Sequence, residues 1–181
     1  MDRSLRVATS LDLPALGELI SRSARGLGVQ SYRREQIEGA LTGAFGVDTQ
    51  LVLDGTYFAI EADSVLVACG GWSFRRTLFG SDAGLGRDAG LLDPRSDAAK
   101  IRAFFVDPAY ARQGLGRRLL AHCESEALRR GYTRFELMAT LTGVPLYETC
   151  GYVLGDLVRY PVAQGVTIEF IPMRKDVHPS R

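Results

Sequence analysis

The segment with the clearest chemical signature is 106–120, VDPAYARQGLGRRLL, where an apolar run passes through two glycines into an amphipathic stretch. Gly114 and Gly116 allow the backbone to curl tightly and leave no Cβ between their N–H groups and a ligand. The first N–H groups of a helix have no internal partner, and the helix dipole adds partial positive charge there. The segment therefore predicts a cradle for a phosphate or pyrophosphate. Three arginines flank it and can add charge-assisted hydrogen bonds: Arg112, Arg117 and Arg118.

Two other nucleotide-binding loops fit this segment less well than a phosphate cradle. A Rossmann dinucleotide site requires GxGxxG, but Gly116 is followed by Arg117, Arg118 and Leu119, so the third glycine is missing. A P-loop is excluded because the sequence contains no GxxxxGK[ST]. A plain strand-to-helix turn with solvated arginines stays open. The letters GLGR also occur at 84–87, but no strand pattern precedes them and no amphipathic stretch follows, so they indicate a loop.

The elements on either side must hold the glycine loop in place. Residues 101–106 are almost continuously apolar, which predicts a strand covered on both faces. Residues 134–138 predict another strand, and 142–150 predict a short helix that ends at Gly151. The helix that follows the glycines should end at Gly131. Its expected buried stripe consists of Leu115, Leu119, Leu120, Cys123 and Ala127.

The rest of the chain also alternates between strand and helix patterns, which predicts one mixed α/β domain. The expected helices are a first one with Leu13, Leu16, Ile20 and Ala24 on one face, and a second one at 31–41. The expected strands are 5–8, then 56–61 and 65–72 as a hairpin within a β-rich segment at 50–74, and finally 152–160 and 166–173 as an antiparallel pair.

Residues 75–99 interrupt this alternation. The segment is rich in glycine and aspartate and shows no periodicity, and about 25 residues is long for an idle loop. A lid or substrate loop and a merely mobile insertion are both compatible with it.

Composition excludes several classes of protein. With 181 residues, 46% hydrophobic content and a net charge of +1, the chain is neither disordered nor a coiled coil, and it is long enough for one sizeable domain. The balanced charge argues against nucleic-acid binding as its main task, and no apolar run is long enough to span a bilayer. Three scattered cysteines and the lack of a secretory signal pattern suit the cytoplasm. Because the chain has two histidines, a metal site built from histidines is not expected.

Three blocks of the chain together resemble the GNAT N-acetyltransferase superfamily. Gly114 and Gly116 match the small residues of its [Q/R]xxGx[G/A] motif, although the first motif position is Ala111. Residues 145–152, PLYETCGY, resemble its FYEKLGF element, and 168–175, IEFIPMRK, resemble its closing strand. The order of elements agrees across nearly the whole chain.

The resemblance implies an α/β fold with a mixed, mostly antiparallel sheet whose central parallel strand pair is splayed and flanked by helices. The domain would cover 1–175, with an inserted loop at about 75–99 and a polar tail at 176–181. The implied acyl donor is acetyl-CoA, with no metal. The residues implied to bind it are Phe105, Val106, Arg112, Gln113, Gly114, Leu115, Gly116, Arg117 and Thr140. Thr140 stands where the family often has an asparagine.

The resemblance also implies which residue donates a proton to the leaving thiolate. This is Tyr147, whose other interpretation is an aromatic ring that packs the short helix onto the sheet. The position that aligns with a catalytic glutamate in some members is Lys100, which cannot act as that base. A chain of water molecules or another carboxylate would then deprotonate the amine. The candidate carboxylates, each more readily explained as structural, are Glu61, Asp54, Asp82 and Glu136.

Two residues are candidates for contact with the acceptor. Arg102 lies within an apolar strand and needs a partner, either an internal carboxylate or an acidic group of the acceptor. Trp72 belongs to a group of aromatic residues near the hairpin and the insertion that either line an acceptor pocket or pack in the core. The other members of that group are Tyr57, Phe74 and Phe79.

The sequence thus predicts an enzyme that moves an acetyl group from acetyl-CoA to an amine of a small molecule or peptide in a ternary complex. The main alternative is a non-catalytic acyl-CoA sensor or regulatory module, and a nucleotide-binding protein that uses the same loop is a further one. No nucleic acid or membrane partner is expected, and the resemblance is compatible with a homodimer.

Overall fold

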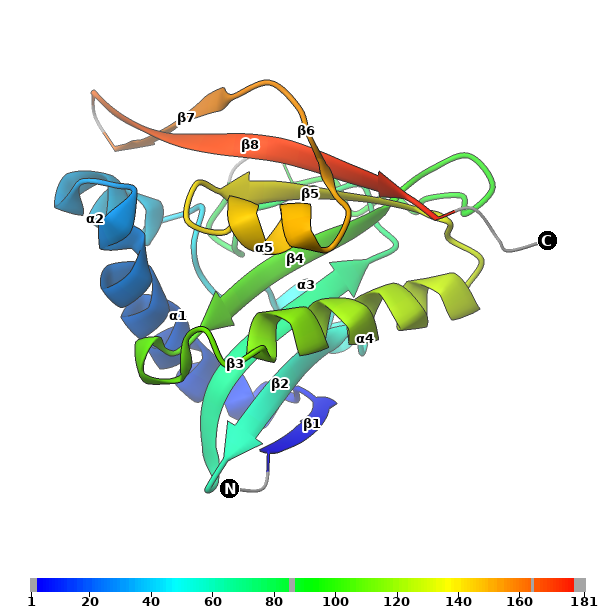
Figure 1. The fold of residues 1–181 in the computed structure, drawn as a ribbon, viewed down its shortest axis with the longest axis horizontal. Helices are drawn as coiled ribbons and strands as arrows, with labels where there is room; N and C mark the ends of the chain where they lie inside the picture. Colours follow the sequence, from blue (N-terminus) through cyan, green and yellow to red (C-terminus); the bar gives the residue numbers. More distant parts are fainter. Residues whose placement is uncertain (1–2, 85–86, 164, 178–181) are drawn as a thin grey trace.

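The computed structural model describes residues 3–84, 87–163 and 165–177, and these residues form one eight-stranded sheet with helices on both faces (Figure 1). The strand order is β1-β2-β3-β4-β5-β8-β6, and β7 pairs with β8. Every neighbouring pair is antiparallel except β4 and β5. The strands are β1 Arg3–Val7, β2 Tyr57–Ala62, β3 Val65–Ser73, β4 Ala99–Val106, β5 Arg134–Thr140, β6 Val153–Leu154, β7 Val158–Ala163 and β8 Val166–Asp176.

Two hydrophobic cores hold the helices against the sheet, one on each face. The α-helices are α1 Leu13–Leu27, α2 Arg34–Ala40, α3 Thr49–Leu53, α4 Leu115–Arg129 and α5 Val144–Thr149. One core joins α4 and α5 to the sheet through residues such as Leu119, Phe135 and Tyr147. The other joins α1 and α2 to the opposite face through residues such as Leu16 and Ile37. The five residues predicted as the stripe of α4 are its buried residues, so that prediction is confirmed.

The parallel pair β4 and β5 separates after a short contact. Only Ala99, Lys100 and Ile101 of β4 pair with β5, opposite Phe135, Glu136 and Leu137. Beyond that point the two arrows diverge in Figure 1. The predicted mixed sheet with a splayed parallel pair is therefore confirmed, and the separation leaves an opening in the middle of the sheet.

A β-bulge in β4 lies at the edge of this opening. Cys69 of β3 pairs with Phe105, and Gly71 pairs with Arg102, so two residues of β4 stand opposite one residue of β3. Ala103 has φ +56°, a value that residues with a side chain rarely adopt. A bulge takes backbone groups out of the strand ladder and redirects side chains. The sequence pattern did not predict this irregularity.

Several predicted elements need correction. The β-rich segment expected from residue 50 begins with the helix α3 instead, because Asp48 accepts a hydrogen bond from the Leu51 N–H and caps it. The strand expected at 152–160 is split into β6 and β7. Residues 103–106 are only partly buried, because this end of β4 borders the opening.

The structure describes most of the insertion and the start of the expected tail. The described residues of 75–99 contain no helix, and their one isolated bridge joins Arg75 to Leu91 before Ala99 starts β4. The tail was expected from 176, but β8 runs through Asp176, which pairs with Arg134. Residues 85 and 86 of the second GLGR string, and 178–181 of the tail, lie outside the described residues.

Candidate functional site

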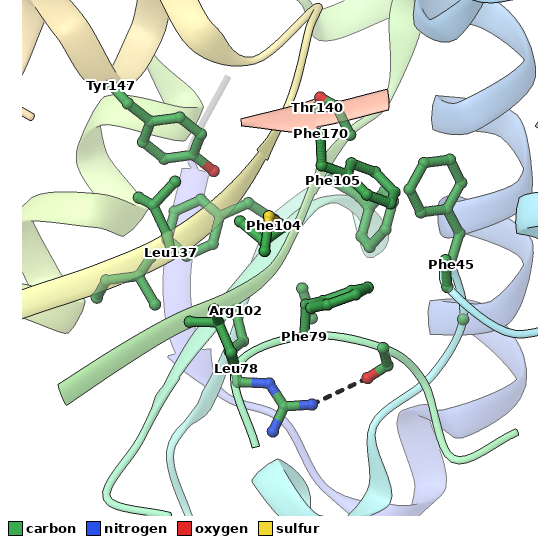
Figure 2. A pocket seen from close by; sticks show the side chains of 16 residues that line it. Phe45, Leu78, Phe79, Arg102, Phe104, Phe105, Leu137, Thr140, Tyr147 and Phe170 are labelled. Atoms are coloured by element: carbon green, nitrogen blue, oxygen red, sulfur yellow. Dashed lines mark hydrogen bonds between the residues drawn. The ribbon is translucent and has the colours of Figure 1, made fainter. Parts of the chain in front are cut away.

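A pocket of about 80 Å³ lies where β4 and β5 separate (Figure 2). The diverging strands line it with Ile101, Arg102 and Phe105 on one side and Leu137 and Thr140 on the other. Short segments at 44–46 and 78–80 add a wall from outside the sheet, and Tyr147 of α5 and Phe170 of β8 complete the lining. The opening in the sheet is thus lined from β4, β5, β8, α5 and two loops.

The glycine loop next to this opening presents a row of unused backbone donors. Arg112 has φ +60° and Gly114 has φ +81°, and Gly114 is the residue that precedes the first residue of α4. The first helical hydrogen bond at this end is donated by the Arg118 N–H to the Gly114 carbonyl, at 3.0 Å. Within the part of the chain that the structure describes, none of the N–H groups of 112–117 donates to a protein acceptor. A row of free N–H groups at a helix N-terminus is suited to bind an anion.

The two glycines of the loop are required for different reasons. A Cβ on Gly114 would meet no atom within 4 Å, so only its positive φ demands glycine. A Cβ on Gly116 would lie 2.9 Å from Leu146 Cδ2, so this glycine lets α5 pack closely on the first turn of α4. Gly114 therefore sets the backbone conformation of the loop, and Gly116 allows close packing of α5, the helix that carries Tyr147.

The side chains around the loop are partly engaged. The Arg117 guanidinium donates to Thr149 Oγ1 at 3.2 Å, and the Arg118 guanidinium donates to the Arg3 carbonyl at 2.8 Å. Arg3 also donates to the Gln113 side chain. Arg112 is exposed. The loop thus has arginines on several sides, as its sequence predicted.

Tyr147 lies with its ring against the sheet and its hydroxyl turned toward the pocket (Figure 2). The side chain is 8% exposed, and its ring packs edge-on against Phe104 at 6.3 Å and against Tyr152 at 5.8 Å. Burial raises the pKa of this phenol well above its ordinary value, so the hydroxyl stays protonated at neutral pH. Both interpretations of this residue, as a packing ring and as a proton donor, are compatible with this geometry.

Comparison with known proteins identifies the family. A model of the acetyltransferase (GNAT) domain matches residues 83–177, which is more than half of the chain. The chain belongs to the GNAT acetyltransferase family. The matched range contains β4, the glycine loop, β5 and Tyr147, which surround the opening in the sheet.

Relatives of this GNAT chain agree in fold. Ribosomal protein bS18 alanine N-acetyltransferase of Escherichia coli K12 is 36% identical over 74 residues, 38% of the chain and 50% of the relative, so the chain spans about half the length of the curated relatives it matches. A GCN5-related N-acetyltransferase structure from Rhodopseudomonas palustris is 18% identical, with TM-score 0.71 over 98% of this chain and 97% of that one. A Thermoplasma acidophilum N-acetyltransferase solved with coenzyme A is also 18% identical, with TM-score 0.66 over 97% and 99%.

The other residues predicted to bind the donor differ in where their side chains lie. Phe105 and Thr140 both line the pocket, and Thr140 Oγ1 accepts the Gly143 N–H at 3.1 Å. The Val106 N–H donates to Ser23 Oγ at 3.2 Å, an interaction that sequence reasoning missed. The side chain of Leu115 is buried as part of the α4 stripe, so only its backbone is available to a ligand bound at the loop. Of the predicted donor-binding residues, Phe105 and Thr140 therefore line the pocket, whereas Val106 and the glycine loop lie outside its lining, and the Val106 N–H is already used by the protein.

Arg102 finds an internal carboxylate. Its Nη2 lies 2.5 Å from Asp48 Oδ2 and donates to the Gly80 carbonyl at 2.9 Å (Figure 2 shows the bond to the carbonyl). Asp48 also pairs with Arg87 at 2.9 Å. Burial lowers the pKa of Arg102, while Asp48 acts in the opposite direction. Asp48 had not been singled out in the sequence, because nothing local marks it as a partner.

Trp72 is not brought to the pocket. It is fully buried in the core beneath α4, where it packs against Phe74 and Tyr132, each with a centroid separation of 5.9 Å. Tyr57 is also fully buried, and its hydroxyl lies 3.3 Å from Cys69 Sγ. Of the four aromatic residues considered together in the sequence, Phe79 is the one that lines the pocket.

The four candidate carboxylates are engaged elsewhere. Glu61 pairs with Arg6 at 2.6 Å, and Asp54 pairs with Arg75 at 2.7 Å. Asp82 accepts the Thr49 N–H, and Glu136 pairs with Lys100 at 2.5 Å. None of these four lines the pocket. The contacts that these carboxylates make support their interpretation as structural residues.

No helix among the described residues is both long and apolar enough to cross a lipid bilayer.

Proposed function

We propose that this chain transfers an acetyl group from acetyl-CoA to an amine of a small molecule or a peptide, directly and within a ternary complex. The observation that carries the proposal is the row of six free N–H groups at 112–117 beside an opening in the sheet that holds the Tyr147 hydroxyl. When bound, acetyl-CoA supplies a thioester whose carbonyl carbon an amine attacks as the thiol departs. Family membership and the curated relatives' activity on a ribosomal protein support an amine acceptor.

The donor site fits its ligand in charge and shape. The N–H groups of 112–117 would hold the pyrophosphate, with Arg112 free to approach it. The separation of β4 and β5 would admit the pantetheine arm between strands. The backbone N–H groups of Ala103 and Phe104 in the β4 bulge are the candidates to polarise the thioester carbonyl, because the Val106 N–H already donates to Ser23.

The reaction also needs two proton transfers, one to the departing thiolate and one from the attacking amine. The Tyr147 hydroxyl would protonate the departing thiolate, and its raised pKa keeps that proton in place until the transfer. The carboxylates weighed as bases are paired outside the pocket, which supports water-mediated deprotonation of the amine. Much of the rate would come from holding donor and acceptor side by side in the opening.

The first test is thermal unfolding with acetyl-CoA, NAD or ATP. A ligand at about 100 times its dissociation constant stabilises the folded state by about 2.7 kcal/mol, which raises the midpoint by several degrees. We expect a shift with acetyl-CoA and release of free thiol when an amine is added. A shift without any thiol release would indicate a non-catalytic acyl-CoA sensor. A shift with NAD or ATP in place of acetyl-CoA would overturn the proposal.

A further inference from the structure

We propose that the acceptor carries a compact apolar group next to its amine, and that Phe79 of the insertion sets the size of this group. The inference rests on the proposed acetyl transfer and specifies which amines the site takes. Its evidence is the composition and rigidity of the pocket wall opposite Tyr147.

Four phenylalanine rings from four different parts of the chain form this wall, which we call the phenylalanine wall: Phe45, Phe79, Phe105 and Phe170. Phe45 meets Phe105 edge-on at 5.9 Å and Phe170 at 6.0 Å, and Phe79 meets Phe170 at 5.6 Å. Figure 2 shows these rings grouped on the side of the pocket away from Tyr147. Aromatic surface of this kind binds apolar groups and disfavours desolvated charges.

Phe79 comes from the insertion, and the structure holds that part of the insertion firmly. The Gly80 carbonyl accepts hydrogen bonds from Arg102 at 2.9 Å and from Arg87 at 3.1 Å. The next residue, Ser81, donates through its N–H to the Gly43 carbonyl at 3.0 Å. On its outer side the Phe79 ring packs edge-on against Tyr160 at 5.1 Å. This stretch of the insertion is therefore a fixed wall of the pocket, because hydrogen bonds and packing hold it along its length and not only at its ends.

Arg102 is the one charged residue among the described lining residues, and it does not give the pocket a basic character. Arg102 lines the pocket, but its charge is paired with Asp48 at 2.5 Å, and its side chain is 2% exposed. An acceptor carboxylate can reach little of this guanidinium, because the Arg102 side chain is almost completely buried and is held by Asp48 and by the Gly80 carbonyl. Arg102 is thus a positioning residue for the wall, and the acceptor side of the pocket is apolar.

The pocket volume, which the acetyl end of the donor shares, limits the size of the group. At about 80 Å³ it is roughly half of the 150 Å³ cavity that admits benzene. A side chain of about four carbons, such as that of leucine, matches this space better than an aromatic ring. Removal of the Phe79 ring would enlarge the pocket on the insertion side and admit the larger group.

The test measures kcat/KM by thiol release, with acetyl-CoA and the amides of glycine, leucine, phenylalanine, lysine and aspartate as acceptors. We expect leucinamide to exceed glycinamide, lysinamide and aspartamide by about tenfold or more, since a single methylene in an apolar pocket is worth about 10–200-fold. In Phe79→Ala we expect the preference to pass from leucinamide to phenylalaninamide. Phe74→Ala is the matched control, because it removes the same ring from the Trp72 side of the sheet and should keep the leucinamide preference.

Three outcomes would overturn the inference: a charged amide as the best acceptor, an equal loss for every amide in Phe79→Ala, or no transfer to any amide. The midpoint shift with acetyl-CoA, measured on each variant, reports separately on the donor site. If that shift is absent in the unmodified chain, the proposed function fails. If the shift is present and transfer occurs without a preference for apolar acceptors, only the inference about the phenylalanine wall fails.

Discussion

Arg102 Nη2 and Asp48 Oδ2 lie 2.5 Å apart next to the pocket, and both side chains are almost completely buried. Asp48 also receives Arg87, so one carboxylate faces two guanidinium groups. The same aspartate caps α3 through the Leu51 N–H. This cluster connects β4 to α3 and the insertion, and it therefore determines where the outer wall of the pocket stands.

Asp48→Asn should strongly destabilise the fold. Removal of one partner from a buried ion pair leaves an uncompensated charge and typically costs about 3–5 kcal/mol in the free energy of unfolding. Urea unfolding measures this cost. The control is Glu38→Gln, which breaks the exposed pair with Arg25 and should cost less than about 1 kcal/mol. Equal costs for the two variants would contradict the central role of Asp48.

Tyr147→Phe should lower kcat by about 10²–10⁴ and leave the midpoint shift with acetyl-CoA unchanged, because only the proton donor is lost. The matched control is Tyr152→Phe, whose hydroxyl donates to Glu124 at 2.9 Å and does not line the pocket. This control should retain kcat. Since burial raises the pKa of Tyr147, the rate should also show no loss from phenol ionisation up to pH 10. Unchanged turnover in Tyr147→Phe would falsify the assignment.

Gly114→Ala and Gly116→Ala should separate the two functions of the loop. An alanine at Gly114 must adopt φ +81°, which costs about 1–2 kcal/mol, and relaxation of the loop would weaken acetyl-CoA binding. An alanine at Gly116 would press on Leu146, the neighbour of Tyr147, so its larger effect should be on kcat. Unfolding curves and acetyl-CoA titrations of the two variants measure these effects. The reverse pattern would contradict the division.

Acid should destabilise the N-terminal strand region through Asp12. Hydrogen bonds from Arg6 hold the pKa of Asp12 far below its ordinary value, although burial opposes this. Since the folded-state pKa is lower than the unfolded one of about 4, the stabilisation is complete above pH 4 and is lost as the pH falls further. Asp12→Asn should therefore flatten the decline in the unfolding midpoint below pH 4. A decline as steep as that of the unmodified chain would argue against this role.

The three cysteines should react with a thiol reagent in two classes. Cys69 and Cys123 are fully buried, and burial raises the pKa of Cys69 to about 12. Cys150 is partly exposed. At pH 8 the folded chain should therefore react at Cys150 first, and all three thiols should react in denaturant. Mass spectrometry of the labelled peptides identifies the order, and early labelling of Cys123 would contradict the packing of α4.

Local sequence determined the elements that carry the donor site. The spacing of five apolar residues defined the buried face of α4, and glycine at 114, 131 and 151 stands where φ is positive. These features depend on backbone conformation and on periodicity within a few residues, which a linear pattern records directly. The separated strand pair followed from the resemblance of several such elements in order, and not from any one of them.

Only the tertiary structure decided which side chains meet. The partner of Arg102, the acceptor for the Val106 N–H and the ring that lines the pocket come from Asp48, Ser23 and Phe79, each distant in sequence from the site that it completes. The bulge at Ala103 likewise depends on the register between β3 and β4. Contacts of this kind are set by the packing of whole elements against one another, and the composition of a local segment carries no record of the partner it will meet.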